Sequence, residues 1–112
     1  EATSEKKAMG WYADGKISAL VGTHTHVGTA DARILLQGTA YLTDIGMVGA
    51  RDSVIGLKKE EVIEHMKAEE DISLKVVIPE DGPAIINGVL IEIDPQTRRA
   101  IKIERVDLET EV

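Results

Sequence analysis

The chain has 112 residues, no cysteine and a formal net charge of −7. This length supports one domain with a modest core, and the absence of cysteine excludes disulfides and thiolate metal sites. The acidic balance argues against an extended surface for nucleic-acid phosphates, although one focused nucleotide site is compatible with it. Because neither a signal-peptide pattern nor an apolar run of about twenty residues occurs, we expect a cytoplasmic protein that does not enter a membrane.

The first predicted element is a helix over residues 4–13. Its apolar side chains share one face, which we expect to pack against a sheet; they are Ala8, Trp11 and Tyr12. Asp14-Gly15 supplies a stop signal directly after this helix.

Short strands are predicted next. Residues 17–21 are apolar except for Ser18, which favours a central strand covered on both faces. Residues 33–36 and 39–43 predict two further strands, and a glycine-rich loop over residues 44–49 follows them. A helix, a tight glycine turn and a buried strand together indicate an α/β unit.

A second helix is predicted over residues 58–69, and its expected buried stripe is Val62, Ile63 and Met66. We expect His65 to lie on the solvated face of this helix and assign it no role.

The last forty or so residues change character. Apolar residues alternate with others over three segments, 72–78, 89–93 and 101–103, which predicts an antiparallel meander with one buried face. Residues 94–97 predict the turn between the last two segments. The apolar phase slips after residue 103, so we expect a β-bulge or the end of the strand near Glu104 and Arg105.

Two of the three histidines, His24 and His26, follow the predicted strand over residues 17–21. They belong to residues 22–27, called the histidine loop below. If this segment is extended, the two rings project to the same side, with roots roughly 6 to 7 Å apart. That spacing suits two metal ions with one ring on each at least as well as one shared ion. Alternatively both histidines only finish a strand at the surface, because two imidazoles never complete a metal site.

The neighbours of the two histidines support a loop that binds something. Gly22 carries no side chain where the backbone must leave the sheet, and Thr23 and Thr25 can hydrogen-bond the loop or a bound oxyanion. Asp44 closes one strand and opens the glycine-rich turn. It either belongs to the site or caps the amides of its own turn, and the sequence favours neither alternative.

The histidine loop resembles the G-H-x-H ligand motif of calcineurin-like metallophosphoesterases. Longer strings resemble the bacterial YmdB-like subfamily; they are Glu1–Lys6, Met9–Tyr12, Gly22–Val27, Thr29–Asp31, Gly38–Tyr41, Thr43–Asp44, Gly46–Met47 and Asp52–Gly56. Gly28 departs from the pattern, which has glutamine there. The resemblance covers essentially the whole chain. It implies an α+β fold in which residues 1–112 form the C-terminal portion of a single metallophosphoesterase domain, a four-layer αββα sandwich with a mixed sheet and antiparallel C-terminal strands.

The resemblance also implies a function. His26 would bind the first metal and His24 the second, with Thr23, Thr25 and Asp44 close to the site. The remaining ligands and the catalytic histidine belong to the N-terminal half of the family's domain, so no catalytic residue is expected in this chain and the isolated chain should be inactive. Two divalent ions, iron or manganese with zinc as an alternative, would activate water to hydrolyse small phosphodiesters, notably 2′,3′-cyclic nucleotides.

A different class of function stays open. The acidic meander between Ile72 and Leu108 could dock a partner through an exposed strand edge, which would make the chain a non-catalytic interaction or oligomerisation module. Self-association into a homo-oligomer is compatible with either hypothesis.

Overall fold

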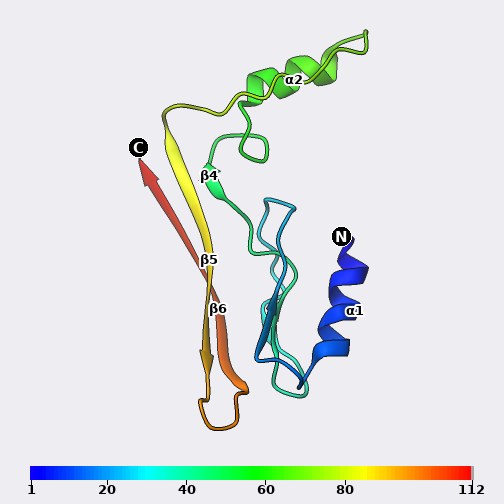
Figure 1. Ribbon diagram of the computed structural model, residues 1–112. Coiled ribbons are helices and arrows are strands. Elements are labelled where there is room, and N and C mark those ends of the chain that lie inside the picture. Colours follow the sequence, from blue (N-terminus) through cyan, green and yellow to red (C-terminus); the bar gives the residue numbers. More distant parts are fainter. Residues whose placement is uncertain (112) are drawn as a thin grey trace. The chain divides into compact units, whose positions relative to one another are not determined.

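A computed structural model describes residues 1–111, which divide into two units. The first unit contains residues 1–46 and 87–107, and the second contains Met47–Ile86 with the end of the chain from Leu108. The elements, in chain order, are α1 (Thr3–Ala13), β1 (Ala19–Val21), β2 (Arg33–Ile34), β3 (Ala40–Leu42), β4 (Val48–Ala50), α2 (Lys59–Lys67), β5 (Pro83–Ile93) and β6 (Ala100–Glu111) (Figure 1). This is a mixed α and β chain, as the sequence predicts.

The first unit contains a small mixed sheet in the order β1-β3-β2. β1 runs parallel to β3, and β2 runs antiparallel to it. All three residues of β3 are buried, whereas those of β1 are only partly covered. The prediction that the strand after α1 is the central, doubly covered one is therefore wrong, because β3 has a neighbour on each side and β1 has one among the described residues.

Helix α1 forms where the sequence predicts a helix, but the predicted buried face is wrong. Trp11 and Tyr12 are 49% and 70% exposed, and the buried residues are Gly10 and Ala13. A Cβ placed on Gly10 would stand 2.6 Å from two ring atoms of Tyr41. The missing side chain therefore lets the helix backbone approach Tyr41 of β3 closely.

The C-terminal part of the chain is a long β hairpin made by β5 and β6, which run in opposite directions (Figure 1). The predicted turn between them is confirmed, since Arg98 N–H bonds the Asp94 carbonyl at 2.7 Å and Asp94 N–H bonds the Arg99 carbonyl at 2.9 Å. β4 adds a third strand antiparallel to β5.

The strand predicted over residues 72–78 does not form. This segment has no regular structure, and Val76 and Ile78 are 71% and 67% exposed. A backbone bond from Lys58 N–H to the Val77 carbonyl, 2.7 Å long, ties it to the start of α2. Alternation alone does not make a strand where no partner strand is hydrogen-bonded along it.

Helix α2 lies within the predicted range, but its predicted buried stripe is wrong. None of its residues is buried, and Met66 is 79% exposed. His65, expected on the solvated face, is instead partly covered, and its Nδ1 is a buried atom without a hydrogen-bond partner in the structure. The contacts that would cover the Met66 face are thus not made among the described residues.

No helix within residues 1–111 combines the length and the apolar character that crossing a bilayer requires.

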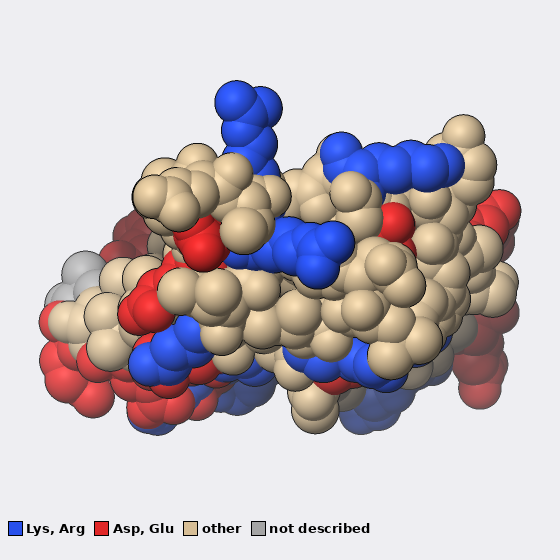
Figure 2. Space-filling model, turned by 90° about the horizontal axis from the view of Figure 1, so that it is seen from below, with Lys and Arg blue, Asp and Glu red and all other residues tan. Residues whose placement is uncertain are grey.

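Figure 2 shows one face of the molecule, on which lysine and arginine side chains stand apart from one another among uncharged residues, with acidic side chains beside them. The basic side chains on this face therefore do not form a continuous basic surface.

Candidate metal-binding loop

The histidine loop leaves the sheet of the first unit at the end of β1. Gly22 N–H bonds the Leu42 carbonyl and Ile45 N–H bonds the Gly22 carbonyl, each at 2.9 Å, so the parallel pairing continues one residue beyond β1. A Cβ on Gly22 would overlap the backbone carbonyl of Thr43. The sequence correctly predicts that this position must lack a side chain where the backbone turns away.

The two imidazole rings lie beside each other on the surface. Their centroids are 6.5 Å apart and the ring planes meet at 85°. The prediction of an extended segment is wrong, because φ is 110° at His24 and 65° at His26. These positive angles are uncommon for residues with a side chain, and they cluster at functional sites and tight turns. The rings are thus neighbours through a twisted backbone rather than through strand alternation.

Asp44 lies under this loop and is fully buried. Its Oδ1 accepts the Gly46 N–H at 2.9 Å, which confirms that it caps its own turn. Its Oδ2 accepts the Thr25 N–H at 2.9 Å and a bond from Lys6 Nζ at 3.1 Å. Burial raises the pKa of Asp44, but the hydrogen bonds from Thr25, Gly46 and Lys6 outweigh it and lower the pKa to about 2. Asp44 therefore stays ionised and holds the residue between the histidines.

Thr25 bonds the loop itself, which is one of the two roles expected for its hydroxyl, whereas the role expected for the Thr23 hydroxyl stays a prediction. Thr25 Oγ1 donates to the Val27 carbonyl at 2.9 Å. The Thr23 carbonyl accepts a bond of 2.7 Å from Lys6 Nζ. The turn around the histidines is therefore closed by its own side chains and by a cation from α1.

A second carboxylate fixes the segment that follows the loop. Asp31 accepts hydrogen bonds from the side chains of Thr29 and Thr43 and from the Thr43 N–H. Lys7 Nζ lies 3.2 Å from its Oδ2. Burial raises the pKa of Asp31, yet these bonds together hold it well below its ordinary value. Asp31 binds its own loop to the end of β3 and does not join the histidines.

The donor set of the loop fits part of a metal site. Imidazole nitrogen is a ligand for transition metals such as iron and zinc, and both rings are exposed. Within residues 1–111 no group of three or more His, Cys, Asp or Glu side chains is placed to hold one ion. A complete centre would therefore need ligands from beyond the described residues.

Sequence reasoning missed Lys6 and Arg105. Lys6 lies one helical turn before Gly10, on the covered face of α1. If the small residues Gly10 and Ala13 had been taken as the covered face, Lys6 would have been identified as part of it. Arg105 takes the partly covered position two residues after Ile103 on β6. The phase slip seen in the sequence thus coincides with a charged residue on the covered face. The strand end predicted near Glu104 and Arg105 is wrong, because β6 continues to Glu111, whereas the alternative, a β-bulge, stays a prediction.

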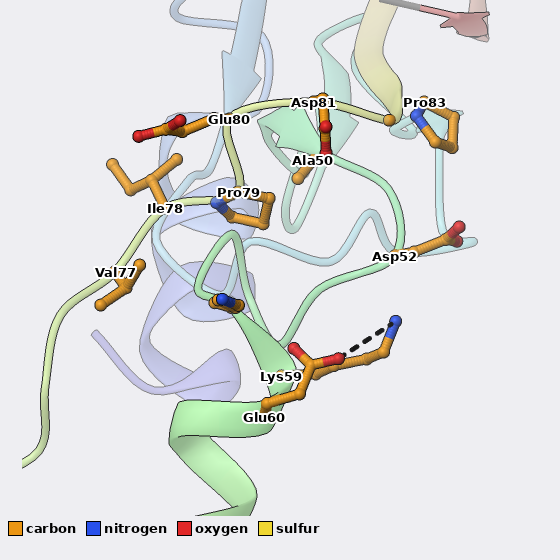
Figure 3. Close-up of a pocket in the computed structure, with 12 residues that line it drawn as sticks. Ala50, Asp52, Lys59, Glu60, Val77, Ile78, Pro79, Glu80, Asp81 and Pro83 are labelled. Carbon is orange, nitrogen blue, oxygen red and sulfur yellow. Dashed lines mark ion pairs between the residues drawn. The ribbon is translucent and has the colours of Figure 1, made fainter.

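A cavity of about 600 Å³ lies in the second unit, at the start of α2. It is lined by residues 77–83, Asp52 and the first residues of α2 (Figure 3). Lys59 and Glu60 form an ion pair of 3.9 Å within it, drawn as a dashed line in Figure 3. None of the lining residues belongs to the unit that carries the histidine loop. The cavity therefore does not include the histidine loop.

Comparison with known proteins finds relatives that match almost the whole chain. A family model described as YmdB-like protein matches residues 1–106. The 2′,3′-cyclic-nucleotide 2′-phosphodiesterase of Bacillus subtilis is 52% identical over 106 residues, which are 95% of this chain and 39% of that protein. The chain thus spans about two fifths of the length of this relative.

Solved structures resemble the chain as well. A phosphatase of Mycoplasma pneumoniae superposes with a TM-score of 0.85 at 38% identity, over 99% of this chain and 39% of that one. A hypothetical protein of Thermus thermophilus gives 0.83 at 36% identity, over 97% and 41%.

The fold and the loop define a class: an α+β segment with an exposed His-x-His pair at the end of a parallel strand. The matches then identify the family. The chain belongs to the YmdB-like protein family.

Proposed function

We propose that this chain is the C-terminal part of a metal-dependent phosphodiesterase and supplies two ligands, His24 and His26, to a two-metal centre. The observation that carries the proposal is the pair of exposed imidazoles with centroids 6.5 Å apart at the end of a parallel strand. Carboxyl ends of parallel strands are where α/β sheets place their binding sites. The 52% sequence identity to the cyclic-nucleotide phosphodiesterase of B. subtilis supports the proposal that this donor pair binds metal.

The chain's own residues would bind and orient. Each histidine would hold one ion, and the remaining ligands and the catalytic acid would come from the part of the family's domain that precedes this chain. The ions, iron or manganese with zinc as an alternative, would supply an activated water and charge stabilisation on the phosphoryl oxygens. The fold of the whole domain would be the four-layer αββα sandwich.

The substrate class we propose is a small phosphodiester, above all a 2′,3′-cyclic nucleotide. The B. subtilis relative carries that activity in its name. The net charge of −7 and the dispersed basic residues in Figure 2 agree with a small substrate held at one focused site rather than with a long nucleic acid.

The test uses the full-length protein and three alanine variants. His24→Ala and His26→Ala should each lose most bound metal and at least about 100-fold in hydrolysis of 2′,3′-cyclic AMP, since each removes a ligand. His65→Ala is the matched control, because it removes the third histidine, which belongs to the other unit. Metal is counted by mass spectrometry and hydrolysis by product formation.

Parent-level metal content and hydrolysis in both loop variants would refute the enzyme hypothesis. The interaction module would then be the surviving explanation. Loss of activity in His65→Ala alone would place the site elsewhere in the chain.

A further inference from the structure

A buried ion pair lies directly under the histidine loop. Lys6 Nζ is 3.1 Å from Asp44 Oδ2, and the two side chains are 9% and 0% exposed. Lys6 comes from α1, whereas Asp44 follows β3. Two elements of the first unit that are far apart in sequence therefore meet at this point.

Each member of the pair also holds the backbone of the loop. Lys6 Nζ donates to the Thr23 carbonyl at 2.7 Å, and Asp44 Oδ2 accepts the Thr25 N–H at 2.9 Å. Thr23 precedes His24, and Thr25 lies between the two histidines. The pair thus fixes the peptide groups on both sides of His24.

The backbone it fixes is one that the loop would not adopt by local preference. Positive φ at His24 and His26 is disfavoured for residues with a Cβ, and such conformations persist only where their surroundings impose them. The loop backbone is held by hydrogen bonds to the buried, charged side chains of Lys6 and Asp44.

We propose that Lys6 and Asp44 are positioning residues that hold the two imidazoles in the orientation needed to bind metal. This inference rests on the proposed function of His24 and His26. It assigns to the pair a role that fold stability alone does not explain, because a buried ion pair can often be replaced by uncharged residues without loss of stability. Its charges instead select one conformation of the loop.

The neighbouring lysine provides a matched control. Lys7 follows Lys6 in the chain, but its side chain is 51% exposed and its Nζ contacts Asp31, 3.2 Å away. Lys7→Met therefore removes a charge of the same kind from the same helix without touching the histidine loop.

The experiment measures Mn²⁺ affinity of the full-length protein by isothermal titration. Lys6→Met leaves a buried carboxylate unpaired, so the double variant Lys6→Met/Asp44→Asn, which removes both charges, is the principal one. Loss of a group that orients metal ligands lowers metal affinity by about 10- to 100-fold. We expect that loss in the double variant with a preserved far-ultraviolet spectrum, recovery of hydrolysis at saturating Mn²⁺, and no change in Lys7→Met.

A second measurement separates this inference from the proposed function. In the metal-free protein, long-range ¹H–¹⁵N spectra report the His24 and His26 rings directly. We expect dispersed ring signals in the parent that move towards random-coil positions in the double variant, and unchanged signals in Lys7→Met.

The outcomes are distinct. A parent that binds no Mn²⁺ refutes the proposed function, while the ring spectra still test the pair. A folded double variant with parental affinity and parental ring signals overturns the positioning role. A double variant that unfolds while Lys7→Met folds also overturns it, because the pair would then serve stability only.

Discussion

The guanidinium of Arg105 donates a 2.9 Å hydrogen bond to the carbonyl of Ile45, 60 positions earlier in the chain. Longer contacts of 3.4 and 3.5 Å reach the carbonyls of Asp44 and Thr29. Gly28 leaves the space that the guanidinium occupies, since a Cβ there would overlap it. Arg105 therefore ties β6 to the loop that follows β3, next to the buried carboxylate under the histidines.

Arg105→Met should lower the free energy of unfolding. The variant loses the bond to Ile45 and the pair with Asp107, whose Oδ1 lies 2.7 Å from Arg105 Nη2. Hydrogen bonds from charged donors contribute about 1.5–3 kcal/mol, so we expect a loss within that range. Urea unfolding of the full-length, metal-free protein measures it.

Lys102→Met is the control on the same strand. Lys102 pairs with Glu104 at 3.6 Å, and both side chains are about half exposed. Exposed pairs contribute little, so this variant should stay within about 0.5 kcal/mol of the parent. Equal losses in the two variants would show that Arg105 acts only as another surface charge.

At position 24 glycine should give a more stable protein than alanine, which is the reverse of their usual order inside a helix. At φ of 110° a Cβ is strained, so His24→Gly should be more stable than His24→Ala by about 1 kcal/mol in the metal-free protein. His65 lies inside α2, where His65→Ala should be more stable than His65→Gly by about the same amount. Thermal unfolding ranks the four variants. Alanine equal to or better than glycine at position 24 would mean that the loop relaxes without strain.

Much of the architecture follows from local pattern. The 3.6-residue periodicity places both helices, and turn residues place the hairpin between β5 and β6. The position of the histidine loop after a short strand also follows, because a glycine marks where the chain leaves the sheet. The resemblance to the YmdB-like family added what spacing could not, namely the hypothesis that the two imidazoles are ligands of a two-metal centre.

The errors come from contacts that pattern does not encode. Gly10 and Ala13, not the aromatic pair, are the buried residues of α1, and Gly10 lies close against Tyr41 of β3. Residues 72–78 alternate like a strand but bond no partner strand. The twist at His24 depends on hydrogen bonds from residues distant in sequence, and an exposed H-x-H segment gives no local sign of it.

Asp31 should make the free energy of unfolding depend on pH in the acid range. In the folded state the pKa of Asp31 is held below the ordinary value of about 4. The ionised carboxylate therefore contributes fully to the free energy of unfolding above about pH 4, and this contribution is lost as the pH falls further. Asp31→Asn should be less stable than the parent at pH 7, and the difference should shrink between pH 5 and pH 3. Urea midpoints across this range measure it.

The exposed Asp71 gives the comparison for the loss of a carboxylate. Asp71→Asn changes only a surface side chain, so its free energy of unfolding at pH 7 should stay within about 0.5 kcal/mol of the parent. A gap between parent and Asp31→Asn that stays constant down to pH 3 would show that the hydrogen bonds from Thr29 and Thr43 do not select the charged form.

Gly22→Ala should damage both the fold and the loop. The added Cβ meets the backbone carbonyl of Thr43, which cannot rotate away as a side chain can, so β1 and β3 must separate at the point where the loop begins. Overpacking typically costs about 1–3 kcal/mol and occasionally more, and we expect a loss towards the upper end of this range because backbone must move. Urea unfolding gives the stability, and Mn²⁺ titration should show weaker binding in the fraction that remains folded.

Gly49→Ala tests whether this reflects the site or glycine replacement in general. The nearest atom to a Cβ on Gly49 is Met47 Sδ at 3.6 Å, an ordinary contact. That variant should stay within about 1 kcal/mol of the parent and keep its Mn²⁺ affinity. If Gly22→Ala matches Gly49→Ala in both measurements, then the close approach of β1 to the Thr43 carbonyl is not what sets the origin of the histidine loop.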